Sequence, residues 1–83
     1  MQKSIYSKDQ EQLQNLLREL RKQKGYKQKD LAALLKTPQS FVSKYEVGER
    51  RLDILEIRRI CLVLGISLSN FVKELEARIR EAE

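Results

Sequence analysis

Apolar residues recur along this chain three or four positions apart, which is the spacing of an amphipathic α-helix. The first clear series is Leu13, Leu16, Leu17 and Leu20, and similar series follow further along. No segment alternates apolar and polar residues for long, so no β-strand is predicted. The pattern therefore predicts an all-α protein.

Helix start and stop signals divide the chain into five predicted helices. Ser7 and Gln10 form a capping-box sequence that is expected to begin the first helix, and Gly25 is expected to end it. Residues 1–6 are then expected to form a flexible arm.

The second and third predicted helices are short and lie close together in sequence. The second spans residues 28–35, and the turn after it is Lys36-Thr37. Thr37 is expected to cap the third helix, which begins at Pro38 and ends near Glu46, before a glycine. The expected buried residues of the second helix are Leu31, Ala32 and Leu35.

Two further helices follow. Asp53 and Glu56 form a second capping box, Gly65 ends the fourth helix, and Ser67 caps the fifth. The sequence thus predicts one compact domain over residues 1–83, with no linker or repeat. The inward faces are expected to carry Ile54, Ile57, Ile60, Cys61 and Leu64 in the fourth helix, and Leu68, Phe71, Val72, Leu75 and Ile79 in the fifth.

The charge of +5 is concentrated in the amino-terminal third. Residues 1–29 contain eight Lys or Arg against three Asp or Glu, whereas residues 53–83 contain five against six. A basic surface favours a polyanionic partner, because Lys and Arg release counterions from phosphates. Charge alone, however, describes an ordinary soluble surface equally well.

Composition excludes several kinds of site. The chain has no histidine, and Cys61 is its single cysteine, so we expect no metal site, no disulfide and no cofactor. Cys61 is expected to be a buried, inert thiol. The amino terminus carries no apolar signal segment, and the longest apolar run is too short to span a membrane, so we expect a cytoplasmic protein. We predict neither enzymatic activity nor a small-molecule ligand.

The third predicted helix has one polar face. At about 100° per residue, Gln39, Ser40, Ser43 and Lys44 share one side, while Val42 lies on the other. Gln, Ser and Lys are side chains that hydrogen-bond base edges in the DNA major groove. In an isolated helix such a face would be ordinary solvated surface, so its meaning depends on the neighbouring segments.

Those segments resemble the lambda-repressor and Cro-type helix-turn-helix proteins, also called the XRE family. The resemblance covers roughly residues 16–75 and includes the order of two short helices, a tight turn and paired arginines. Each match is short, but their joint spacing is specific. The matching residues are Gln28, Leu31-Ala32, Gln39-Ser40, Val42-Ser43-Lys44, Glu46-Val47-Gly48 and Leu64-Gly65-Ile66-Ser67.

The resemblance implies a role for each matching residue. The third helix would enter the major groove while the second crosses the DNA backbone. Arg21 would pair with Glu46 and join the first helix to the end of the third. Base contacts are expected from Gln39, Ser40, Ser43, Lys44 and Phe41, and backbone contacts from Lys27, Gln28, Lys29, Arg50 and Arg51.

Three residues depart from the family pattern. Lys36 replaces a turn glycine, so a left-handed backbone there would cost about 1 kcal/mol or be avoided. Lys27 replaces a small N-cap residue and adds a positive charge. Phe41 is bulkier than usual, and it either meets a thymine methyl group or covers the edge of the core.

These inferences predict a sequence-specific transcriptional regulator, a repressor in the simplest case, that binds a palindromic operator on double-stranded DNA as a homodimer. Leu75 and Ile79 are candidates for the dimer contact, with residues 76–83 as the end of the fifth helix. Two alternatives remain open at this point. The same fold serves antitoxins, which have a toxin partner, and restriction–modification controllers, and a protein-interaction adaptor would not bind DNA at all.

Overall fold

The computed structural model describes the backbone of residues 3–83 and the side chains of residues 8–83. This part of the chain forms five α-helices and no strand. The all-α fold expected from the sequence is confirmed. The helices are α1 (Lys3–Gln23), α2 (Gln28–Leu35), α3 (Gln39–Val47), α4 (Ile54–Leu64) and α5 (Leu68–Ala82).

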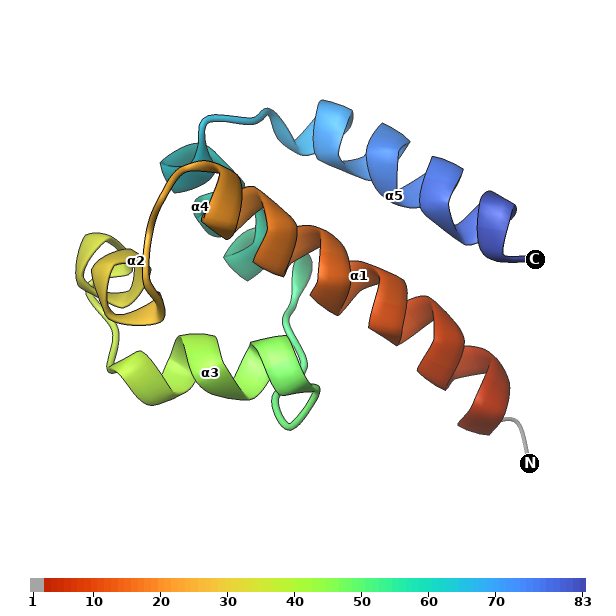
Figure 1. Ribbon diagram of the computed structural model, residues 1–83, viewed down its shortest axis with the longest axis horizontal. Coiled ribbons are helices and arrows are strands. Elements are labelled where there is room, and N and C mark those ends of the chain that lie inside the picture. Colours follow the sequence, from red (N-terminus) through yellow and green to blue (C-terminus); the bar gives the residue numbers. More distant parts are fainter. Residues whose placement is uncertain (1–2) are drawn as a thin grey trace.

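The long helix α1 runs through the molecule, and the other helices are arranged around it (Figure 1). α5 lies along one side of α1 and α3 along the other, while α2 packs against both α3 and α4. The described molecule measures 36 × 25 × 21 Å. All five helices contribute to one core, whose buried apolar residues are Leu16, Leu17, Leu31, Ala32, Leu35, Val42, Tyr45, Ile60, Cys61, Leu64 and Phe71.

Most of the predicted helix ends are present. Gly25 and Gly65 follow α1 and α4 with φ angles of 77° and 78°, which side-chain-bearing residues adopt only at a cost. At the start of α4, the Asp53 carboxylate accepts from Glu56 N at 2.8 Å, and the Glu56 carboxylate accepts from Asp53 N at 2.9 Å. Ser67 Oγ accepts from Asn70 N at the start of α5. Each of these bonds satisfies a backbone N–H that has no partner within its helix.

The start of α1 was predicted wrongly. The helix begins at Lys3, so Ser7 lies inside it and is not an N-cap, and residues 3–6 are helical rather than a flexible arm. Residues 1–2 of the predicted arm lie outside the described residues. No Pro or Gly interrupts this segment, so extending the helix gains a backbone hydrogen bond for each residue added, and a local capping preference does not prevent it.

The turn between α2 and α3 also differs from the prediction. Thr37 does not cap α3: Pro38 occupies that position, and the Thr37 hydroxyl points back to the carbonyl of Ala32 at 3.5 Å. Lys36 adopts the left-handed conformation, with φ 60° and ψ 45°. The N–H groups of Lys36 and Thr37 then donate to the carbonyls of Ala33 and Ala32 and close the end of α2. The packing of α2 against α3 therefore imposes a backbone geometry that lysine does not favour.

Two residues predicted to face inward are exposed. Ile54 is 57% exposed in the first turn of α4, and the inward face of that helix starts instead at the half-buried Ile57. Val72 of α5 is 41% exposed, whereas its neighbour Phe71 is buried and Leu68 and Leu75 pack against the core. Helical spacing gives the direction of a face, but the neighbouring helices decide how wide the covered part is.

Candidate nucleic-acid interface

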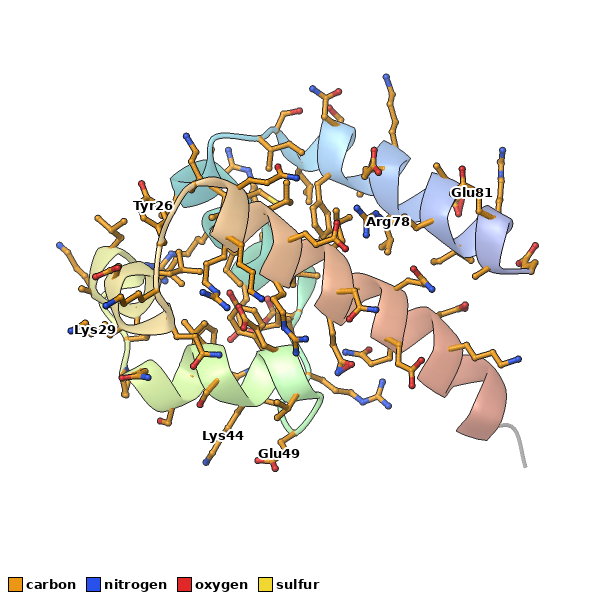
Figure 2. All side chains as sticks on the ribbon, viewed as in Figure 1. Tyr26, Lys29, Lys44, Glu49, Arg78 and Glu81 are labelled. Atoms are coloured by element: carbon orange, nitrogen blue, oxygen red, sulfur yellow. The ribbon has the colours of Figure 1, made fainter. Side chains whose placement is uncertain are left out.

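α3 separates an exposed polar face from a buried apolar one. Val42 and Tyr45 are buried in the core, whereas Gln39, Ser40 and Lys44 are exposed. Figure 2 shows Lys44 and, just after the helix, Glu49 projecting away from the rest of the molecule. The polar face expected from the helical wheel is therefore accessible at these three residues.

Ser43 and Phe41 are less accessible than these residues. Ser43 is half-buried, and its hydroxyl donates to the carbonyl of Ser40 at 3.2 Å. The Phe41 ring packs on the core edge-on to Tyr45, with 5.5 Å between ring centroids and 75° between planes. Of the two roles considered for Phe41, these contacts support covering the edge of the core.

Glu46, near the end of α3, is the centre of a buried polar network. Its side chain is only 1% exposed, and Arg21 from α1 pairs with it through two bonds, Nε to Oε2 at 2.7 Å and Nη2 to Oε1 at 3.0 Å. Arg21 Nη1 also donates to the carbonyl of Tyr26. The pair inferred from the resemblance is thus present. It ties α1 to α3 and to the segment that leads into α2.

Two more side chains complete this network. Arg18 Nη2 donates to the Glu46 carbonyl at 3.0 Å, and Gln28 Nε2 donates to Glu46 Oε1 at 3.0 Å. The resemblance assigned Gln28 only to a phosphate and gave Arg18 no role. Arg18 lies one turn before Arg21 on the same face of α1, and this helical spacing was the available signal.

The start of α2 carries two exposed lysines, Lys27 and Lys29, on either side of Gln28. The Lys27 side chain has no acceptor atom, so it cannot cap the helix. Asp30, three residues later, supplies the capping bond instead: its carboxylate accepts from Lys27 N at 2.8 Å. Figure 2 shows Lys29 at the outer edge of α2. This end of the helix therefore combines two flexible cations with backbone N–H groups that favour an anion.

The paired arginines after α3 are in different environments. Arg51 is exposed, whereas the Arg50 guanidinium is bound to Glu56 through Nη2–Oε2 at 2.8 Å and Nη1–Oε1 at 3.3 Å. The sequence predicted Glu56 only as a capping residue. The structure brings it to Arg50, because Glu56 lies in the first turn of α4 and Arg50 lies in the loop that leads into this helix.

The two candidate dimer residues, Leu75 and Ile79, are both half-buried, and Leu75 packs against the core. A more exposed apolar surface lies on α4, where Ile54, Leu55 and Leu62 are 57%, 69% and 58% exposed. These three residues share one side of the helix at 100° per residue.

The described residues contain no group of three or more His, Cys, Asp or Glu side chains placed to hold a metal ion. Cys61 is buried in the core, and burial raises the pKa of its thiol to about 11. A thiol in this state is a weak nucleophile. None of the helices in the described part of the chain is long and apolar enough to cross a membrane.

Comparison with known proteins identifies the family. A helix-turn-helix family model matches residues 17–71, which include α2, α3 and the buried network. A solved structure of an XRE-family like protein from Pseudomonas syringae pv. tomato str. DC3000 is 43% identical in sequence, and the match covers 92% of this chain and 93% of that one with a TM-score of 0.84. No curated protein matches the chain. The chain belongs to the XRE family of helix-turn-helix DNA-binding regulators.

Proposed function

We propose that the protein is a sequence-specific transcriptional repressor that binds a palindromic operator as a homodimer. The observation that carries this proposal is the exposed polar face of α3, opposite a buried face that fixes the helix on the domain. Gln39, Ser40 and Lys44 can hydrogen-bond base edges once the helix lies in the major groove. Ser43, whose hydroxyl donates to a backbone carbonyl, has a smaller role.

Contacts to the DNA backbone come from both ends of this face. We call the exposed polar face of α3, formed by Gln39, Ser40 and Lys44, the reading face. Lys27 and Lys29 lie at the start of α2, and Arg51 follows α3, so cations flank this face. Gln28 retains one amide N–H beyond its bond to Glu46, and this N–H can donate to one phosphate oxygen. The Arg21–Glu46 pair holds Gln28 in place and joins the two ends of the motif.

A homodimer places two reading helices on one side of the duplex. Half-sites one turn apart require a spacing of about 34–36 Å between the two α3 helices. The exposed apolar side of α4 and the end of α5 near Ile79 are the surfaces available for this contact. Repression follows if the bound dimer blocks polymerase. Such a regulator acts at the chromosome, so we place it in the cytoplasm with the nucleoid.

The direct test is selection from a random-duplex library at physiological salt, followed by sequencing. Recovery of a palindromic motif with half-sites one turn apart is the expected result. Salt-sensitive binding without an enriched motif would contradict sequence-specific repression. No binding at all would favour an adaptor, or an antitoxin that requires its toxin.

A further inference from the structure

Arg50 differs from every other exposed cation of the motif because its guanidinium is held on three sides. Glu56 binds its Nη1 and Nη2 atoms, at 3.3 Å and 2.8 Å. The Arg51 carbonyl accepts from Nη1 at 2.6 Å. The ring of Phe41 lies below the guanidinium plane, with 4.8 Å from Cζ to the ring centroid. A surface arginine normally samples many rotamers, and these contacts select one.

The contacts leave one edge of the guanidinium unused. The Glu56 carboxylate accepts from the end of the guanidinium formed by Nη1 and Nη2. The Arg51 carbonyl accepts from the remaining Nη1 hydrogen. Nε–H and the second Nη2 hydrogen have no acceptor among the described residues. These two donors are parallel, which is the geometry that binds a pair of acceptors.

The Arg50 guanidinium lies against α3, at the boundary between its apolar and polar faces. Phe41, which supports the guanidinium, neighbours Lys44 on the helical wheel, and Arg50 N donates to the Lys44 carbonyl at 3.3 Å. The Arg50 side chain is 39% exposed, so it is fixed without being covered. Arg50 is therefore held, with its side chain accessible, next to the helix that is proposed to enter the major groove.

We infer that Arg50 reads a guanine in each half-site through its Nε–H and Nη2–H donors, and that Glu56 and Phe41 are the residues that position it. This inference rests on the proposed DNA-reading function and changes the role of Arg50 from a backbone contact to a base contact. Guanine O6 and N7 form the paired acceptor that suits this edge. A phosphate suits it less well, because the Glu56 carboxylate offsets the charge of Arg50 and repels a second anion.

The experiment is library selection with four proteins: the wild type, Arg50→Ala, Glu56→Gln and the matched control Arg51→Ala. Arg50→Ala removes the paired donors, so guanine preference at one position of the half-site should fall about tenfold or more, with the rest of the motif intact. Glu56→Gln keeps an acceptor for Asp53 N and loses the carboxylate charge, so it should weaken the same position. Arg51→Ala removes the same charge and should weaken binding without changing the selected motif.

Each other outcome has a distinct meaning. If Arg50→Ala selects the wild-type motif, Arg50 does not read a base, and the inference is wrong. If Arg50→Ala relaxes one position but Glu56→Gln does not, the positioning role of Glu56 is wrong. If the wild type itself selects no motif, the proposed function fails first. Thermal unfolding checks each fold, and Phe41→Leu, which removes the supporting ring, replaces Glu56→Gln if that variant is unfolded.

Discussion

Gln39 and Arg51 lie at opposite ends of the reading face, and their side chains are both exposed. Gln39→Ala should weaken operator binding by about 1–3 kcal/mol and relax preference at one base position. Arg51→Ala should weaken binding to all sequences alike and reduce the slope of log K against log salt by about 1. Titrations on operator and random duplex at several salt concentrations measure both effects. Identical behaviour of the two variants would contradict this division of roles.

The hydroxyl of Tyr45 is buried without a hydrogen-bond partner among the described residues. Burial, together with the neighbouring Glu46 carboxylate, raises the pKa of Tyr45 well above its usual value. Removing an unsatisfied hydroxyl relieves a desolvation cost of about 1–3 kcal/mol, so Tyr45→Phe should be as stable as the wild type or more stable. Urea unfolding measures this difference. Tyr45→Leu serves as the contrast and should be less stable, because it also removes the ring that packs against Phe41.

The Cys61 thiol makes the free energy of unfolding depend on pH in the alkaline range. The pKa of its thiol is raised from 9.0 to about 11 in the folded state, so the folded chain retains a proton that the unfolded chain loses. This contribution is complete below pH 9, and it is lost as the pH rises through 11, a change of roughly 2 kcal/mol. Cys61→Ala should therefore be less stable than the wild type at pH 8, and the gap should narrow by pH 10.5. Chemical unfolding at the two pH values tests this, and a constant gap would show that the thiol is not responsible.

At the scale of elements, the turn between α2 and α3 carries avoidable strain. Lys36 has φ 60°, where a residue with a side chain is strained by about 1 kcal/mol and glycine is not strained. Lys36→Gly should therefore raise the free energy of unfolding by up to about 1 kcal/mol. The matched control is Gly25→Ala: Gly25 has φ 77° with open space around it, so the substitution should cost a similar amount through backbone strain alone. A destabilised Lys36→Gly variant would show that the lysine side chain contributes more than its backbone costs.

At the scale of the whole molecule, two surfaces compete as the dimer contact. Leu55 represents the exposed side of α4, and Ile79 represents the end of α5. Leu55→Gln should shift the protein toward monomer and lower operator affinity. Burying the leucine side chain in the contact stabilises the dimer by about 1.5–3 kcal/mol, and this stabilisation is lost with glutamine. Glutamine adds no charge, so the electrostatic attraction to DNA is unchanged. Sedimentation at tens of micromolar measures the effect, with Ile79→Gln tested in parallel.

The result for this pair assigns the contact. Loss of the dimer with Ile79→Gln alone would place the contact on α5. A wild-type protein that stays monomeric both with and without DNA would remove the homodimer from the proposal.

The local part of this structure was predictable. Helix positions followed from apolar spacing, and the ends at Gly25, Asp53, Gly65 and Ser67 followed from capping chemistry, because these signals act between residues a few positions apart. The exposed face of α3 was predictable for the same reason. The start of α1 was missed because capping preferences are small and no residue from Lys3 to Ser7 stops a helix.

The contacts between residues far apart in the sequence depend on how the helices pack. Spacing alone did not predict that Gln28 and Arg18 would join Glu46, or that Glu56 would hold Arg50 over Phe41. The left-handed Lys36 also depends on packing, because α2 and α3 fix the turn despite its cost. The sequence alone thus determined the helices, their polar faces and the family, since these depend on local spacing and residue type. Folding determined which side chains are buried or held by a partner and which are exposed, since that depends on long-range contacts.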